Sequence, residues 1–357
     1  MTVRTPNVER AMEVSAFFDG ARLTLARHLS GMRKSELAES LARSVSEVSA
    51  WESGMARPPA SAVAELALGL AIPAEFLMMR PDPILSTTPH FRSLRSTTQL
   101  DRDQAFAYGR LAAEVTSTLE SRVEFPRVEV PRITVAIDDL DSAAPERAAR
   151  SVREAWGLGT APIRHVVRLV ENHGVLVVFG SARTAAVAAY SFEGAHRPIV
   201  VLDPNVDDPH RQRFDVAHEL GHLVMHCDAE PGHRVAELQA DRFAAEFLLP
   251  SAQTGDSFAT GGAGGARLVD GEVGTVVAPV IEQPSLLPRA LELLDEIGVD
   301  SHQLIEECRV SDADFRTITG RYPVARHVET PSLRDDSSYA DRVVSMAEWS
   351  HMKGESP

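Results

Sequence analysis

VAHELGHLVMH at residues 216–226 is the sharpest signal in the sequence. It places His218 and His222 four residues apart, so that on a helix both imidazoles share one face and can reach one metal ion. Glu219, beside the first histidine, carries a carboxylate that can take a proton from a water molecule. Gly221 costs about 1 kcal/mol in the interior of a helix, which indicates that something must approach the backbone closely there.

A second helical stretch, ELQADRFAAEFLLP at residues 237–250, offers a third ligand. A catalytic zinc site needs three protein ligands and one open position. The pattern predicts two helices, at 210–226 and 234–248, and an antiparallel arrangement would bring Glu237 back to the histidines. Asp241, one helical turn further on, is then placed to hold a histidine N–H. The alternative for Glu237 is an ordinary exposed carboxylate on a helix.

Three nearby residues are predicted to stay outside the metal site. His226 lies about 12 Å along the helix axis from His218, so we expect a histidine at the helix C-terminus rather than a ligand. Cys227 points away from the histidine face and is expected to be packed. His233 falls in the turn between the helices, where a solvated loop is the default.

The two stretches together resemble one family. RFDVAHELGHLVMH followed by ELQADRFAAEFLLP, with SVREAWGLGTAPIRHVVRLVENHGVLVV and AAYSFEGAHRPIVVLD upstream, resembles the ImmA/IrrE family of metallopeptidases over about residues 145–250. The resemblance implies a zincin-like zinc peptidase with an α+β core and one Zn2+ per chain. It implies His218, His222 and Glu237 as ligands and Glu219 as the base. In that family the usual substrates are DNA-binding repressors.

The N-terminal part has a separate pattern of short helices. LTLARHLSGMRKSELAESLARSVSEVSAWESGMARPP at residues 23–59 predicts a helix at about 45–53, with Ser44 as its N-cap and Gly54 at its end. The stretch resembles the XRE (Cro/C1-type) helix-turn-helix over about residues 20–79. In such modules the second helix enters the major groove. The resemblance implies base contacts from Val45, Ser46, Ser49 and Ala50, and phosphate contacts from Lys34, Arg43 and Arg57.

Charge limits where nucleic acid can bind. Residues 1–95 hold 11 basic and 10 acidic residues, whereas the rest of the chain has a net charge of −16. An acidic body repels nucleic acid, so DNA contact is expected only in the N-terminal part. The expected recognition helix carries Glu47 and Glu52 but no Arg or Lys, which weakens attraction to phosphate. The alternative is a helical module that docks a protein, such as a repressor.

Composition and patterning predict the remaining organisation. No apolar run is long enough for a membrane span, and the N-terminus has no signal core, so we expect a cytoplasmic protein without membrane contact. The two cysteines, Cys227 and Cys308, exclude a disulfide framework. Strand-like runs (VPRITVAI, VLVVFG, RPIVVLDP) mixed with helices predict an α+β class with a small sheet. GGAGGA at 261–266 lacks the Lys-Ser/Thr of a phosphate loop, which favours a linker.

We therefore expect six segments along the chain. They are a helix-turn-helix domain at 16–80, a linker and connecting helix at 81–125, a zinc peptidase domain at 126–250, a Gly-rich linker at 251–285, a helical C-terminal region at 286–326 and a flexible tail at 327–357. Two functions remain open. One is a zinc endopeptidase with a fused DNA-binding module that acts on a helix-turn-helix repressor. A homodimer is one possible state of this enzyme. The other is an XRE-type transcription regulator whose zinc domain only senses. Glu219 favours the first, because a sensor has no need of a base.

Overall fold

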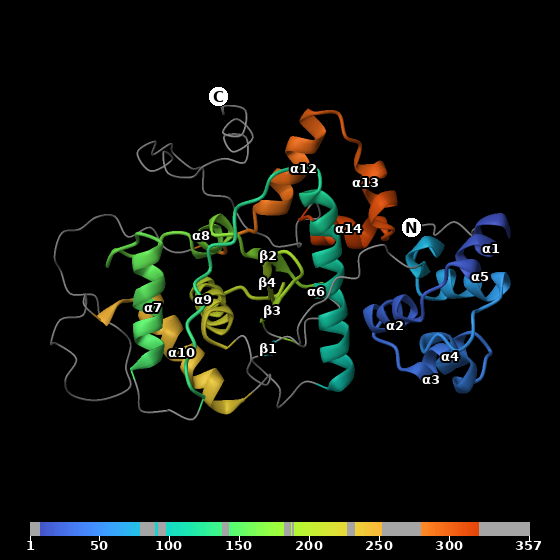
Figure 1. The fold of residues 1–357 in the computed structure, drawn as a ribbon, viewed down its shortest axis with the longest axis horizontal. Helices are drawn as coiled ribbons and strands as arrows, with labels where there is room; N and C mark the ends of the chain where they lie inside the picture. Colours follow the sequence, from blue (N-terminus) through green and yellow to red (C-terminus); the bar gives the residue numbers. More distant parts are fainter. Residues whose placement is uncertain are drawn as a thin grey trace.

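The computed structural model of the chain describes residues 8–78, 90–91, 98–137, 143–181, 187, 189–226, 233–251 and 280–320. Short N-terminal helices come first, followed by a small sheet covered by helices and then by a C-terminal helical group (Figure 1). The predicted α+β class is confirmed. The GGAGGA segment, Cys227 and the tail from 327 lie outside the described residues. Among the described residues, no helix is both long and apolar enough to cross a bilayer.

The N-terminal helices are short because caps and glycines divide them. They are α1 (Val8–Ala16), α2 (Gly20–Leu29), α3 (Lys34–Ser40), α4 (Val45–Glu52), α5 (Ala60–Gly69) and the 3-10 helix η1 (Ala74–Leu77). Ser44 caps α4 by accepting a hydrogen bond from the backbone N–H of Glu47 at 3.2 Å. Gly54, just past the end of α4, has a φ of 73°, which favours glycine. The side chains of Leu37, Val48 and Trp51 are buried together in one core.

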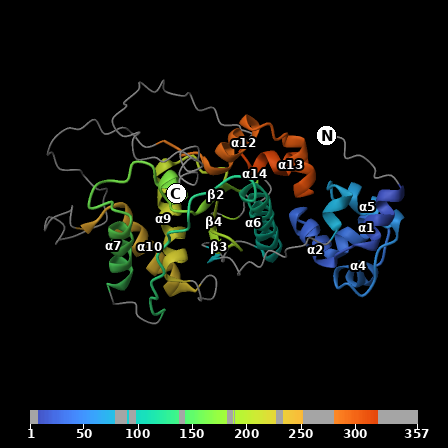
Figure 2. The same cartoon turned by 45° about the horizontal axis from the view of Figure 1, so that its top comes forward.

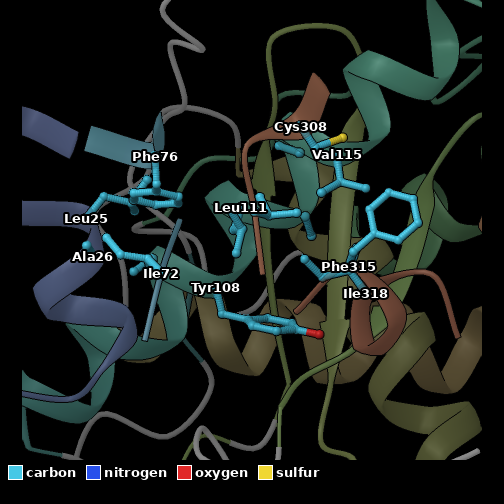
Figure 3. Close-up of a cluster of buried hydrophobic side chains, with 14 of the residues drawn as sticks. Leu25, Ala26, Ile72, Phe76, Tyr108, Leu111, Val115, Cys308, Phe315 and Ile318 are labelled. Atoms are coloured by element: carbon cyan, nitrogen blue, oxygen red, sulfur yellow. The ribbon is translucent and has the colours of Figure 1, made fainter. Parts of the chain in front are cut away.

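The long helix α6 (Gln99–Glu120) joins the N-terminal helices to the sheet. Arg22 on α2 forms a buried ion pair with Glu114 on α6, in which Nη1 of the arginine donates to both carboxylate oxygens at 2.6 and 2.8 Å. Figure 3 shows Phe76 of the N-terminal part on one side of Leu111 of α6, and Phe315 of the C-terminal part on the other. Figures 1 and 2 both show α6 between the N-terminal helices and the sheet. A segment that the sequence indicates as a connector is thus packed on both sides.

The sheet has four short strands in the order β1-β3-β4-β2. The strands are β1 (His90–Phe91), β2 (Leu176–Phe179), β3 (Tyr190–Glu193) and β4 (Pro198–Leu202). The β2–β4 pair is parallel, and the β3–β4 and β1–β3 pairs are antiparallel. Alternation along β4 divides its side chains between two cores: Val200 packs with the α9 side, and Val201 packs with the α6 side. Both faces of the sheet are therefore buried.

Different helices cover the two faces of the sheet. On one face the strands contact α8 (Val166–Asn172) and α9 (Pro209–Met225), and α7 (Ala144–Ala155) and α10 (Arg234–Leu248) pack against α9 in the same core. On the other face the strands contact α6 and α14 (Asp312–Ile318), and the C-terminal helices α12 (Leu286–Glu296) and α13 (Ser301–Cys308) pack against α6. The predicted helices at 210–226 and 234–248 are confirmed by α9 and α10.

The prediction of a strand at VPRITVAI, residues 130–137, is wrong. This segment is irregular and extended rather than part of the sheet. Its backbone bonds to helices instead: the N–H of Ile133 donates to the carbonyl of Val224 near the end of α9, at 2.9 Å. The carbonyl of Ala136 accepts from the side chain of Gln239 on α10, at 2.8 Å. Because these partners satisfy the backbone polar groups, high strand propensity does not place the segment in the sheet.

Candidate metal centre

Helix α9 carries the polar residues of the centre into the interior. Its start is fixed by Asp208, whose carboxylate accepts from the N–H of His210 at 2.8 Å, and by Pro209 in the first turn. From Asp215 to Met225 every residue of α9 is buried. Buried polar side chains are costly unless they are hydrogen-bonded or bind a ligand, so the ones on this helix require partners.

Gly221 lets α10 pack closely against α9. A Cβ atom added at Gly221 would lie 3.0 Å from Cδ1 of Phe243 and 3.3 Å from its Cβ, tighter than ordinary contact. The aromatic ring of Phe243 is fully buried at this crossing. The close approach expected from a glycine inside the helix is therefore confirmed, and the approaching group is the side chain of the neighbouring helix.

The structure brings His218, His222 and Glu237 into one cluster. Their potential ligand atoms all lie within 4.8 Å of one another. The two imidazole Nε2 atoms are 3.1 Å apart, and they lie 3.4 and 3.5 Å from the carboxylate oxygens of Glu237. In a tetrahedral zinc site with bonds of about 2.0–2.1 Å, neighbouring ligand atoms are roughly 3.3 Å apart. The spacing of the three donors thus fits a small divalent metal.

The two kinds of ligand differ in exposure and charge. The side chains of both histidines are 1% exposed, whereas that of Glu237 is 19% exposed, so Glu237 is the most accessible of the three. Burial acts to raise the pKa of Glu237, but the two neighbouring histidines, His218 and His222, outweigh it and lower that pKa to about 2. Glu237 is therefore an anion at neutral pH, as a metal-binding carboxylate must be.

Glu219 lies on α9 beside the cluster and is fully buried. Its Oε2 atom accepts a hydrogen bond from the hydroxyl of Ser191 on β3 at 2.7 Å. Its Oε1 atom has no hydrogen-bond partner among the described residues. Burial raises the pKa of Glu219, against the opposing effect of the two histidines. One oxygen is thus held by the sheet, and the other is left without a hydrogen bond among the described residues.

Ser191 was not among the residues expected from the sequence. It lies in AAYSFEG, where one small polar residue interrupts an otherwise apolar run. Its side chain is fully buried and faces α9, whereas its neighbours Tyr190 and Phe192 face α6. A polar residue inside a buried strand could have identified Ser191 as a site residue, because a buried hydroxyl requires a hydrogen-bond partner.

Neighbouring residues occupy distinct positions around the cluster. The carboxylate of Asp241 lies 2.9 Å from Nδ1 of His218, on the ring nitrogen opposite the ligand atom. His226 caps the C-terminus of α9 and lies outside the ligand cluster, with its ring against His222. His233 is exposed at the start of α10.

The candidate DNA contacts lie around α3 and α4. Val45 and Ser46 are exposed at the start of α4, whereas Ser49 and Ala50 are half-buried. Arg57 is exposed in the loop that follows. The first turn of α4 is therefore the most accessible part of this surface.

Two of the expected phosphate contacts are engaged within the protein. The ammonium group of Lys34 contacts the hydroxyl of Ser49 at 3.0 Å and the carboxylate of Glu52 at 3.1 Å. Arg43 pairs with Glu47 at 3.4 Å and with Glu65 at 3.0 Å. These ion pairs reduce the positive charge that the surface offers to phosphate.

Comparison with known proteins supports the metal centre and says nothing of the N-terminal helices. No curated protein and no solved structure gives a significant match to the chain. A family model matches residues 170–263, which contain β2, β3, β4, α9 and α10 and all the residues of the cluster. That matching family is the peptidase family M78, in its IrrE N-terminal-like domain.

Proposed function

We propose that the chain is a zinc-dependent endopeptidase with a fused N-terminal DNA-binding module, and that it regulates transcription by cleaving a repressor-type protein. One observation carries the proposal: His218, His222 and Glu237 converge, and Glu219 presents an oxygen without a partner beside them. A metal-assisted hydrolase needs both parts, a ligand set and a base.

The donor set favours zinc. Two imidazole nitrogens and one carboxylate oxygen are a set that catalytic zinc sites use, with a fourth position kept for water or substrate. Other first-row divalent metals bind similar ligands, so the identity of the metal is itself measured below.

The residues around the cluster can perform peptide hydrolysis without a covalent intermediate. A bound zinc ion supplies Lewis acidity that polarises the scissile carbonyl and the attacking water. Glu219 accepts the proton of that water at Oε1 while Ser191 holds Oε2 in place. The same carboxyl group then donates the proton to the nitrogen of the leaving amine. Water attacks directly, so no serine or cysteine nucleophile is needed.

The alternative is a regulator whose metal domain senses but does not cleave. A sensor requires only the ligands, whereas this chain also buries Glu219 completely next to them. Burying a carboxylate without a full set of partners costs free energy, and such groups cluster at functional sites. The buried Glu219 therefore favours the enzyme over the sensor.

The DNA-binding part of the proposal rests on α4. Its first turn is exposed at Val45 and Ser46, and the N-terminal turn of a recognition helix is the part that meets base edges. That the substrate is itself a helix-turn-helix repressor follows from the resemblance to ImmA/IrrE peptidases. Protein docking by the same N-terminal helices is the alternative use.

Comparative proteomics tests the enzyme. Cells producing the wild-type chain are compared with cells producing Glu219→Gln and with cells producing His222→Ala. We expect Glu219→Gln to keep its metal and to lose cleavage by about 10²-fold or more, because the amide preserves shape but cannot accept the proton. His222→Ala should lose both metal and cleavage. Equal cleavage by wild type and Glu219→Gln would reject the enzyme and leave the sensor.

A further inference from the structure

We propose that His226 and Gln239 form a hydrogen-bond relay that fixes the tautomer and the orientation of His222, so that Nε2 of His222 faces the metal. This inference rests on the metal centre of the proposed function. It concerns positioning, because neither His226 nor Gln239 belongs to the ligand cluster.

The relay begins at a main-chain carbonyl. The side-chain amide of Gln239 is fully buried, and its Nε2 lies 2.8 Å from the carbonyl oxygen of Ala136. A carbonyl oxygen only accepts hydrogen bonds, so the NH2 group of Gln239 must face it. The other end of the amide, Oε1, therefore points toward His226, at 2.9 Å from Nε2 of that ring.

The protonation of the two histidines follows from this anchor. An amide oxygen accepts, so Nε2 of His226 carries the hydrogen. A neutral imidazole has one N–H, which leaves Nδ1 of His226 as an acceptor. That atom lies 3.1 Å from Nδ1 of His222, which must then be the donor. The lone pair of His222 is consequently on Nε2, the atom that faces His218 and Glu237.

The two histidine ligands are thus held by different means. His218 is held through Nδ1 by the carboxylate of Asp241, whose side chain is 46% exposed. The neighbourhood of His222 is closed, since the side chains of His226 and Gln239 are buried. A carboxylate there would be desolvated at high cost, whereas a neutral relay ending on a backbone carbonyl avoids that cost.

The irregular segment before α7 supplies the anchor of the relay. Ala136, which anchors Gln239, is in the segment 130–137. Ile133 of the same segment donates its N–H to Val224 in the last turn of α9, two residues before His226. The segment therefore anchors the relay at Gln239 and also bonds to the turn of α9 that precedes His226.

Zinc affinity and imidazole tautomers test the relay in the full-length protein. The variants are His226→Leu, which removes the acceptor, and His226→Asn, whose Oδ1 can accept from Nδ1 of His222. His173→Leu is the matched control, because it removes a part-buried histidine that stacks on Trp156 outside the relay. Zinc affinity is measured by competition with a chromophoric chelator, and long-range 1H–15N spectra of histidine-labelled wild type report the tautomers.

We expect His226→Leu to bind zinc about 10–100-fold more weakly than wild type, the usual effect of losing a partner of a ligand. His226→Asn should recover most of that loss, and His173→Leu should bind as wild type does. In wild type, His226 should carry its hydrogen on Nε2 with or without zinc, and His222 should carry its hydrogen on Nδ1.

Three results would overturn the relay: wild-type zinc affinity in His226→Leu, equal losses in His226→Leu and His226→Asn, or a hydrogen on Nδ1 of His226. If His226→Leu does not fold, the spectra of wild type and the affinity of His226→Asn decide. Failure of the proposed function can be distinguished from failure of the relay. In the first case wild type would bind no zinc, but the tautomer of His226 could still be measured in the metal-free protein.

Discussion

Ser191 on β3 donates a hydrogen bond to Glu219 on α9 at 2.7 Å and so ties the sheet to the carboxylate beside the metal cluster. The contact uses Oε2 and leaves Oε1 without a partner among the described residues. Both residues are fully buried, so water does not compete for the bond. The sheet therefore sets the direction in which Glu219 presents its second oxygen.

Ser191→Ala should lower the rate of peptide cleavage by about 10-fold while metal content stays unchanged. The substitution removes one charge-assisted hydrogen bond, which contributes about 1.5–3 kcal/mol, and lets the carboxylate rotate. The measurement is kcat/KM on a cleaved substrate together with zinc per chain.

Thr116→Val is the control for Ser191→Ala. It also removes a buried hydroxyl, but one that bonds to Ala112 within α6, away from the cluster. Its cleavage rate should match that of wild type. A Ser191→Ala rate equal to that of Thr116→Val would show that the serine does not position the base.

Zinc binding should be weakened more by loss of a ligand than by loss of a residue that hydrogen-bonds to a ligand. Purified wild type should hold about one zinc per chain, and His222→Ala should lose most of it, because one of three donors is gone. Asp241→Asn should still fill at high zinc concentration but with about 10–100-fold lower affinity, because it weakens a hydrogen bond to the ligand His218 and removes no ligand. Unchanged stoichiometry in His222→Ala, measured by elemental analysis, would reject the site.

The parts of the centre that could be predicted from the sequence are those set by local periodicity. The spacing of His218 and His222 depends only on helix geometry, and Glu237 needs only one further helix packed antiparallel. The role of Ser191 depends on the register of β3 against its neighbours and on the face of the sheet that meets α9. Such pairings join residues far apart in sequence and leave no periodic signal.

Long-range contacts also explain two features of the fold that the sequence does not predict, namely the irregular segment 130–137 and the packing of α6. The segment 130–137 has strand propensity, but its hydrogen-bond partners are α9 and Gln239, which only the assembled structure supplies. The sequence predicts α6 as a helix, but its packing between α2 and the sheet rests on long-range contacts such as the pair of Arg22 and Glu114. Propensity identifies an element and does not determine its neighbours.

A buried carboxylate should make stability depend on pH. Glu171 on α8 accepts hydrogen bonds from the N–H groups of Ser285 at 3.0 Å and Leu286 at 3.1 Å, at the start of α12. Burial raises its pKa to about 7, although these hydrogen bonds act to lower it. A raised pKa means that its contribution to stability is complete below about pH 4.5 and is lost as the pH rises through 7.

Glu171→Gln should remove this pH dependence. The unfolding free energy of wild type relative to Glu171→Gln should fall by roughly 3 kcal/mol between pH 4.5 and pH 8. Urea unfolding of both proteins, each stripped of metal so that the ligands contribute equally, measures the difference. Glu292→Gln, which changes an exposed carboxylate on α12, is the control and should show no such trend. A constant difference between wild type and Glu171→Gln would contradict the raised pKa.

DNA binding should depend on the exposed first turn of α4. Full-length Glu219→Gln, which keeps its metal but does not cleave, is used for genome-wide selection of DNA fragments. We expect enrichment of a partly palindromic sequence bound by a dimer. Because Lys34 and Arg43 are paired with carboxylates, affinity should fall with salt less steeply than for a basic module.

Adding Ser46→Glu should weaken binding to the enriched sequence by at least about 10-fold, because a carboxylate would face base edges and phosphates. Ser61→Glu makes the same change of charge at an exposed position on α5 and should have a smaller effect. Equal losses in the two variants would indicate general repulsion rather than contact through α4. If selection enriches no sequence at all, the acidic recognition helix is better explained as a surface for a protein, and the repressor itself becomes the partner to test against Ser46→Glu.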